Sequence, residues 1–200
     1  MTDTPDEELV RRYLAGDTEA FGSLVRRHEV RVYNVALRVL GNPDDARDAT
    51  QDTFLSCYRR LSSFRGEAAF TTWLHRVTVN ACYDILRKRR RQPVLRRVSD
   101  PDDPLPDLVP TVEDHADATA GSIDVARALR EIPEEYRIVL VLADVQDLPY
   151  EEIARVLDVP LGTVKSRVHR GRLALGRAMG LPGSEAREPA PTPRPSEGGT

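Results

Sequence analysis

The segment from residue 92 to residue 121 limits how the chain can fold. It contains five prolines and a run of aspartates, with little apolar periodicity. A segment of this composition buries too little apolar surface to offset its conformational entropy, so it is typical of a solvated linker. On both sides, apolar residues recur at helical spacings of three and four without sustained alternation. The sequence therefore predicts an all-α protein with two small helical domains joined by a flexible acidic linker.

The first domain is predicted over residues 6–91, behind a disordered N-terminus at residues 1–5. Its helices are expected at residues 6–14, 18–40, 43–61 and 70–91. Asn42 and Pro43 mark the start of the third helix, because asparagine caps the first turn and proline fits the first helical position. Four helices of this length predict a compact bundle.

The second domain is predicted over residues 122–180. Its helices are expected at residues 123–131, 134–145, 150–157 and 160–179. Residues 181–200 are rich in Pro, Glu, Ser and Gly, and are expected to form a disordered tail.

The formal net charge of -3 conceals strong segregation of charge along the chain. Residues 87–97 hold seven basic residues and no acidic one, residues 99–126 carry only acidic charges, and residues 160–184 carry only basic ones. Each basic segment can contact a nucleic-acid phosphate backbone locally, whatever the net charge of the whole chain. The pattern predicts two nucleic-acid-binding surfaces separated by an anionic connector.

Several classes of protein are disfavoured. The acidic N-terminus lacks the order of a signal peptide, and the apolar run Ile138–Ala143 is too short to span a bilayer, so we expect a cytoplasmic protein without membrane insertion. Cys57 and Cys82 lie in apolar helical patterns and are interpreted as core residues, with a redox pair as the alternative. We find no zinc-site spacing and no catalytic constellation, so neither a metal, a cofactor nor an enzyme activity is predicted.

The run YEEIARVLDVPLGTVKSRVHRGRLAL, residues 150–175, has the layout of a helix-turn-helix. Ile153, Ala154 and Leu157 form an inner face, the turn falls at Asp158-Val159, and Val164 and Val168 continue the inner face. Pro160 is expected at the first position of the recognition helix. The candidate duplex-binding residues are Thr163, Lys165, Ser166, His169, Arg170 and Arg172. The alternative is a basic helix that is merely solvated. The turn, the apolar inner face and the basic outer face together favour a helix-turn-helix that binds duplex DNA.

The helix predicted at residues 70–91 carries two different faces. Its expected core side consists of Phe70, Leu74, Val77, Ala81 and Ile85. A second stripe follows at spacings of three and four: Trp73, Arg76, Asn80, Tyr83 and Arg87. Aromatic faces stack on unpaired bases, an amide bonds a base edge and arginines neutralise phosphates, which suits single-stranded nucleic acid. The residues alone leave the alternative that Trp73 and Tyr83 are further core, and favour it.

Three runs together resemble a bacterial sigma factor of the extracytoplasmic-function group. They are DDARDATQDTFLSCYRRLSSFRG (residues 44–66), FTTWLHRVTVNACYDILRKRRR (residues 70–91) and the run from residue 132 to residue 172. The resemblance covers nearly all of residues 6–180. It implies a dissociable initiation subunit of RNA polymerase, with core polymerase and promoter DNA as partners. It also allows an anti-sigma factor, for which the chain shows no motif.

The resemblance implies a division of labour between the domains. The first would open the minus-ten element and capture a flipped base with the help of the loop at residues 62–67. The second would bind the minus-thirty-five element as duplex. The candidate single-strand residues are therefore Phe64, Arg65, Trp73, Arg76, Asn80, Tyr83, Arg87 and Lys88.

The resemblance also implies that the third helix docks on polymerase. Its candidate core-binding residues are Asp45, Asp48, Gln51 and Asp52. Three of them share a polar face, opposite an inner stripe of Ala46, Thr50, Phe54, Cys57 and Leu61. Without the resemblance, an ordinary solvated face explains them equally well.

Two residues depart from the family pattern. Asp158 stands where many members have glycine in the turn, and Asp tolerates the left-handed conformation better than most residues. Pro149 replaces a frequent serine, which loses a cap without blocking the helix. The main rival from another class is a stand-alone helix-turn-helix transcription regulator, which would need neither the stripe nor the acidic linker.

Overall fold

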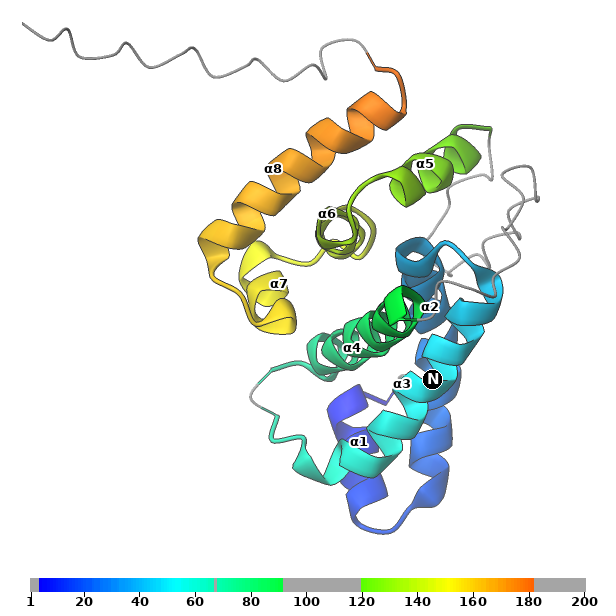
Figure 1. Cartoon of the computed structure of the whole chain (residues 1–200). Coiled ribbons are helices and arrows are strands. Elements are labelled where there is room, and N and C mark those ends of the chain that lie inside the picture. The colour runs from blue at the N-terminus through cyan, green and yellow to red at the C-terminus, as the bar shows by residue number, and fades with distance from the viewer. Residues whose placement is uncertain (1–3, 67, 92–119, 182–200) are drawn as a thin grey trace, which may run out of the picture.

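The computed structural model describes residues 4–66, 68–91 and 120–181, and every regular element in these ranges is helical. The predicted N-terminus, linker and tail fall, apart from their edges, outside the described residues. Figure 1 shows the two groups of helices, α1 to α4 and α5 to α8, lying against each other. Among the described residues, no helix is both long and apolar enough to cross a membrane.

The first group contains α1 (Asp6–Leu14), α2 (Thr18–Leu40), α3 (Pro43–Arg60) and α4 (Phe70–Arg91), with a short 3-10 turn, η1 (Leu61–Ser63), after α3. Local chemistry sets their ends. The Asn42 side-chain oxygen accepts hydrogen bonds from the N–H groups of Asp44 and Asp45, both at 3.0 Å, as an N-cap does. Gly41 ends α2 in the left-handed conformation, with φ +67°.

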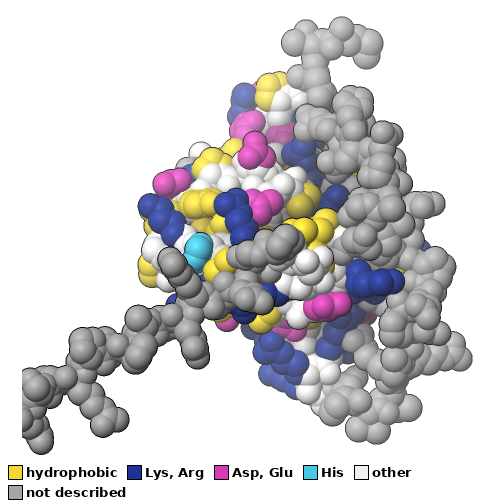
Figure 2. All heavy atoms as spheres, turned by 90° about the horizontal axis from the view of Figure 1, so that it is seen from above, with side chains coloured by type: hydrophobic (Ala, Val, Ile, Leu, Met, Phe, Trp, Pro, Cys, Tyr) yellow, Lys and Arg dark blue, Asp and Glu magenta, His cyan; other side chains and the backbone are white. Residues whose placement is uncertain are grey.

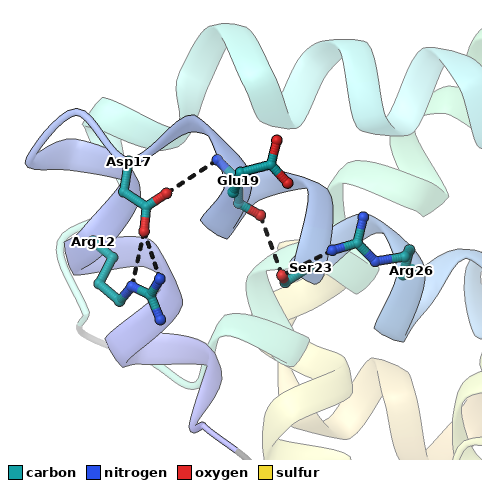
Figure 3. Close-up of polar contacts among 5 residues, drawn as sticks. All are labelled: Arg12, Asp17, Glu19, Ser23 and Arg26. Atoms are coloured by element: carbon teal, nitrogen blue, oxygen red, sulfur yellow. Dashed lines mark hydrogen bonds and ion pairs between the residues drawn. The ribbon is translucent and has the colours of Figure 1, made fainter.

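A polar network fixes the corner between α1 and α2 (Figure 3). One oxygen of Asp17 caps α2 by accepting from the Glu19 N–H at 3.1 Å. The other accepts from two nitrogens of Arg12, at 2.9 and 2.6 Å. Ser23 donates to the Glu19 carbonyl and accepts from Arg26, each at 3.1 Å. The Arg12 contact, partly opposed by desolvation, lowers the pKa of Asp17.

The bundle has a core of its own at the end where α1 packs. Its buried members come from all four helices and η1: Leu9, Val10, Ala20, Leu24, Val32, Cys57, Leu61, Phe70 and Leu74. The prediction that Cys57 and Cys82 are core residues is confirmed, because they are 1% and 0% exposed.

The predicted core face of α4 was too narrow. Val77 and Ile85 are only partly buried, whereas Val79, Cys82 and Leu86 are buried. Thr72, His75 and Thr78 are buried as well. The reason is that α4 is covered twice, by α2 and α3 on one side and by α7 on the other. Figure 1 shows this central place of α4.

The second group contains α5 (Ala120–Glu131), α6 (Glu134–Leu140), η2 (Val141–Val145), α7 (Tyr150–Leu157) and α8 (Leu161–Ala178). Three details differ from the expectations. α5 starts before residue 123, and the helix expected over residues 134–145 widens into a π-helical turn at η2. Pro160 is the N-cap of α8 rather than its first residue, because its ψ of 145° is extended.

α7 and α8 form the predicted helix-turn-helix. Ile153, Val156, Val164 and Val168 are buried, while the expected Ala154 and Leu157 are only half-buried. Asp158 adopts φ 54° and ψ 49°, so the expectation that aspartate takes the left-handed turn is confirmed. The Val159 N–H then donates to the Ala154 carbonyl at 3.1 Å, which closes the end of α7.

The two groups share one continuous core. A single cluster joins Val39, Val79 and Leu86 of the first group to Ile132 and Val156 of the second. α4 packs on α7, and α2 packs on α5, α6 and η2. The acidic linker led us to expect two flexibly joined domains, and the sequence did not predict that they pack against each other.

Candidate nucleic-acid interfaces

The outward face of α8 is available to a duplex. Lys165, Ser166, His169 and Arg170 are exposed, and Thr163 is half-buried. Val164 and Val168 are 0% and 2% exposed, so they fix the rotation of α8 about its axis. The inner and outer faces therefore separate as the helix-turn-helix pattern predicted, with polar and cationic groups of the kind that contact phosphates and base edges.

Arg172 continues this face but has an internal partner. It is exposed, and its Nη2 lies 2.6 Å from Oδ1 of Asp144. This hydrogen bond raises the pKa of Arg172. No ion pair holds Lys165 or Arg170 within the described part of the chain. These two cations are thus better placed than Arg172 to meet phosphates.

Figure 2 looks down on the side of the molecule where α8 lies. Lysine and arginine side chains are spread over this face among acidic, apolar and histidine side chains, rather than gathered into one block.

The α4 stripe divides into exposed polar residues and partly buried aromatic ones. Arg76, Asn80 and Arg87 are exposed, as is Lys88 at the end of the stripe. Arg87 pairs with Asp84 one turn before it. Trp73 and Tyr83 are half-buried. The polar members can meet a ligand directly, and the aromatic members present only part of their surface.

Trp73 belongs to a three-ring cluster at the start of α4. Its ring centroid lies 5.7 Å from that of Phe64 and 5.8 Å from that of Phe70. Phe64 and Phe70 meet edge to face at 5.9 Å. The loop that precedes α4 is therefore attached to the helix through Phe64, whereas its neighbour Arg65 is exposed.

A pocket of about 420 Å³ opens beside this cluster. The first group supplies Phe64, Arg65, Trp73 and Arg76 to its lining. Rings with cations at the rim are suited to a planar base. The second group supplies Arg155, Val156 and Asp158. Sequence reasoning missed these three, because no local pattern says that the end of α7 reaches the loop before α4.

Tyr83 lies at the other end of the contact between the groups. Burial raises its pKa, and the charges of Arg167, Glu134 and Glu135 act on it from the second group. Its ring packs against the core that both groups share. The structure thus places part of the predicted single-strand stripe against the second group.

The outer face of α3 carries most of the predicted docking residues. Asp48, Gln51 and Asp52 are exposed. Asp45 differs from them, because it is half-buried and pairs with Arg89 of α4. Arg89 also donates to the Leu40 carbonyl at 2.9 Å. Asp45 is therefore committed to holding α3 and α4 together.

Two apolar residues continue the exposed face of α3. Leu55 and Tyr58 are 44% and 57% exposed, among the most exposed large apolar side chains of the described ranges. Tyr58 completes a ring cluster with Tyr13 and Phe21, at centroid distances of 6.0 and 5.5 Å. Sequence reasoning missed both residues, although their spacing from Gln51 and Asp52 on one helix face could have revealed them.

The two cysteines do not form a reactive site. Both thiols are free and buried, and burial raises the pKa of each to about 12. The thiolate is the nucleophilic form, so neither residue is activated at neutral pH.

Comparison with known protein families places both halves of the chain. Residues 24–92 match Sigma-70 region 2, and residues 122–175 match Sigma-70, region 4. The first match includes α3 and α4, and the second includes the helix-turn-helix.

Whole-chain relatives agree with these matches. The ECF RNA polymerase sigma factor SigM of Mycobacterium tuberculosis (strain H37Rv) is 41% identical over 175 residues, covering 88% of this chain and 85% of the relative. The RNA polymerase sigma-H factor of Pseudomonas aeruginosa is 33% identical, covering 90% and 96%.

Solved structures share the fold. CnrH, in complex with the cytosolic domain of CnrY, aligns with a TM-score of 0.64 and 26% identity, over 88% of this chain and 97% of the other. The sigma factor RpoE of Bartonella quintana, in complex with the anti-sigma factor NepR, aligns with a TM-score of 0.66 and 22% identity, over 82% and 99%.

Proposed function

Because this chain belongs to the extracytoplasmic-function sigma factors of RNA polymerase, we propose that its two domains read two promoter elements in different forms. Residues 6–91 take the minus-ten element as a single strand, and residues 122–180 take the minus-thirty-five element as a duplex. As a sigma factor, the chain directs core polymerase to promoters and contributes no chemistry of its own.

The observation that carries this division is the contrast between α4 and α8. α4 presents Arg76 in the lining of a pocket together with Phe64 and Trp73, and exposes Asn80 about one turn further along the helix. Stacking surfaces and phosphate-binding cations in one place suit unpaired bases. α8 presents polar and cationic residues on a helix that follows a tight turn and carries no Phe, Trp or Tyr. Such a helix suits the major groove of closed DNA.

The outer face of α3 supports docking on core polymerase. Asp48, Gln51 and Asp52 form its polar part, and Leu55 and Tyr58 add an apolar part. An acidic face with an aromatic anchor suits a basic partner helix, because interface energy concentrates at such anchors. We infer that Leu55 and Tyr58 bind polymerase together with the three polar residues of this face. Asp45 contributes indirectly, because its ion pair with Arg89 holds α3 against α4.

We also infer where the chain works and what regulates it. Core polymerase and promoter DNA place its action in the cytoplasm. The likeness to CnrH, which was solved in complex with the cytosolic domain of CnrY, supports a protein partner for this chain, and membership of the family suggests that this partner is an anti-sigma factor.

Promoter-specific run-off transcription with purified core polymerase tests the function. We expect the chain to co-purify with core polymerase and to start transcripts at discrete sites on genomic promoter fragments. A stand-alone regulator would instead bind duplex DNA tightly by itself and leave core polymerase unable to start at those sites. That outcome would reject the proposed roles of α3 in polymerase binding and of α4 in single-strand binding. Only the proposed role of the helix-turn-helix in duplex binding would remain.

A further inference from the structure

We propose that α1 is a positioning element for single-strand recognition by α4. Asp6 and Glu7, at the start of α1, hold Phe70 in place. Phe70 in turn supports the rings of Phe64 and Trp73, which line the pocket beside α4. This inference rests on the proposed function, because it takes that pocket to be the place where an unpaired base binds. α1 precedes the segment that matches Sigma-70 region 2, so the match itself assigns this helix no role.

A chain of buried contacts leads from α1 to the first residue of α4. Oδ2 of Asp6 lies 2.8 Å from Nε2 of His28 in α2, and His28 is 4% exposed. The ring of His28 lies against the ring of Phe70, with the two centroids 5.6 Å apart. An acceptor at one ring nitrogen sets the orientation of a histidine. Asp6 therefore determines which surface of the imidazole meets Phe70.

Asp6 is itself held firmly. Its Oδ1 accepts from Nη1 of Arg27 at 2.5 Å, and the same nitrogen donates to the Thr4 carbonyl at 2.8 Å. Desolvation opposes ionisation of Asp6, but the hydrogen bonds and charges of His28 and Arg27 outweigh it and lower the pKa of this carboxyl. Since an ionised carboxylate can only accept hydrogen bonds, Nε2 of His28 carries the proton that joins the pair.

Glu7 supplies a cap that the residues next to α4 do not. The Trp73 N–H donates to the Ala69 carbonyl at 3.2 Å, so Ala69 occupies the N-cap position, where alanine has no side-chain acceptor. The N–H of the first helical residue has no partner within its own helix. That of Phe70 donates to Oε1 of Glu7 at 3.4 Å, from 63 residues away in the sequence. A carboxylate is also favoured at this positive end of the helix dipole.

Apolar packing keeps α1 beside these polar contacts. Leu9 and Val10 are 4% and 3% exposed, and they share a core cluster with Phe70 and Leu74. α1 also packs on η1, the turn that leads to Phe64. The helix thus meets both the start of α4 and the segment that enters the loop before it.

Phe70 carries the position of α1 to the pocket. It is 2% exposed, and its ring meets those of Phe64 and Trp73 at centroid distances of 5.9 and 5.8 Å. Phe64 and Trp73 belong to the lining of the pocket, whereas Phe70 does not. Because protein interiors are close-packed, a displaced Phe70 moves the two rings that rest on it. Asp6 and Glu7 therefore act through Phe70, as positioning residues.

Stacking on a base makes this support necessary. The residues of a binding site have to be held within about 0.5 Å of their productive geometry by the residues around them. Phe64 lies in the loop before α4, and loops are less precise supports than helices. The contacts of α1 compensate for this, because they fix the start of α4 and the ring on which Phe64 rests.

The test compares three double variants of the full chain, each lacking the same two negative charges. Asp6→Ala with Glu7→Ala removes both contacts to the start of α4. Asp6→Asn with Glu7→Gln keeps a side-chain acceptor at each position. Glu8→Ala with Glu19→Ala is the control, because Glu8 pairs with Arg11 of its own helix and Glu19 is exposed. Glu7→Ala alone, at an exposed position, repeats the test if the first variant does not fold.

Fluorescence reports the ring cluster directly, because Trp73 is the single tryptophan of the chain. It is measured where far-UV circular dichroism shows every variant folded. We expect the Asp6→Ala, Glu7→Ala chain to show red-shifted emission and stronger quenching by acrylamide, with a smaller change in the Asp6→Asn, Glu7→Gln chain. A merely stabilising role would lower the midpoint of thermal denaturation and leave the emission of the folded chain unchanged. Unchanged emission, or an equal change in the control, would overturn the positioning role.

Permanganate footprinting with core polymerase then measures the effect on the single strand. We expect the Asp6→Ala, Glu7→Ala chain to lower the reactivity of minus-ten thymines about fivefold relative to the control, close to the weaker end of one base-stacking contact. Closed-complex binding should not change. Asn80→Ala serves as the reference for the proposed function. If Asn80→Ala leaves the reactivity unchanged, the proposed function fails, while the fluorescence result stands by itself. Reduced reactivity in Asn80→Ala without any reduction in the Asp6→Ala, Glu7→Ala chain would overturn the role of α1.

Discussion

Burial decides the chemistry of single side chains where α4 meets the second domain. His75 is 7% exposed, and burial lowers its pKa to about 4, against an opposing interaction with the Gln146 side chain. Glu152, Arg31 and His28 act on it more weakly. The imidazole is therefore neutral in the folded chain over a pH range in which the unfolded chain takes up a proton.

This shift predicts acid sensitivity. The stability that depends on neutral His75 should be complete above the unfolded pKa of 6.5 and should be lost as the pH falls towards about 4. The loss should reach up to about 3 kcal/mol, at about 1.4 kcal/mol per pKa unit. Urea denaturation between pH 7 and pH 4 measures it. A His75→Gln variant should lose less over this interval, and an equal loss in both chains would show that His75 is not responsible.

Alanine variants of Trp73 and Asn80 should distinguish a residue that stabilises the fold from one that serves only DNA binding. Trp73→Ala removes contacts with Phe64 and Phe70, so we expect the free energy of unfolding to fall by about 2 kcal/mol. Asn80 is exposed, and Asn80→Ala should change the free energy of unfolding by less than about 0.5 kcal/mol. Thermal denaturation at neutral pH checks both. A fully stable Trp73→Ala chain would mean that the ring does not support the loop and is free to act on DNA alone.

At the scale of elements, the packing of α6 on α8 depends on a missing side chain. A Cβ at Gly171 would lie 3.1 Å from Cγ of Leu140 and 3.3 Å from Cβ of Tyr136. Gly171→Ala should lower the free energy of unfolding by about 1–2 kcal/mol, because this overlap exceeds the gain in helix propensity.

The control lies in the same helix. A Cβ at Gly162 would meet no atom within 4 Å. Because Gly162 is the second residue of α8, Gly162→Ala should stabilise the chain by up to about 0.5 kcal/mol, less than in the middle of a helix. Effects of the same sign in both variants would contradict the close approach at Gly171.

The exposed face of α3 makes a prediction for polymerase binding. Tyr58→Ala should weaken binding to core polymerase by about tenfold or more, because aromatic anchors dominate interface energies. Stability should change by less than about 1 kcal/mol, since the ring is 57% exposed. Glu29→Ala, an exposed position on α2, serves as the control. Titration of labelled chain with core polymerase should show no difference between this control and the unaltered sequence.

Helix ends were more predictable than helix faces. The caps at Asn42 and Gly41 are set by neighbouring residues, so the sequence places them well. The buried face of α4 depends on which elements cover it. Periodicity identified the side towards the bundle, but Thr72 and His75 are buried on the side towards the second domain. No pattern within the α4 sequence indicates that the second domain also packs on this helix.

At the scale of the whole molecule, docking of the two domains was beyond sequence reasoning. Arg137 stands beside an apolar run, and its partners are backbone carbonyls, which have no residue signature. The polar stripe and the recognition helix were predictable, because helical phase alone separates their faces. The contact between the two domains depends on residues that lie far apart in sequence, such as Thr72 and Glu152.

Permanganate footprinting of promoter complexes with core polymerase tests the division of labour between α4 and α8 most directly. Asn80→Ala should retain closed-complex binding and show reduced reactivity of minus-ten thymines, because α4 acts on the melted strand. Arg170→Ala should weaken closed-complex binding first, because α8 reads the duplex. Equal loss of both steps in both variants would contradict the assignment of single-strand recognition to α4 and duplex recognition to α8.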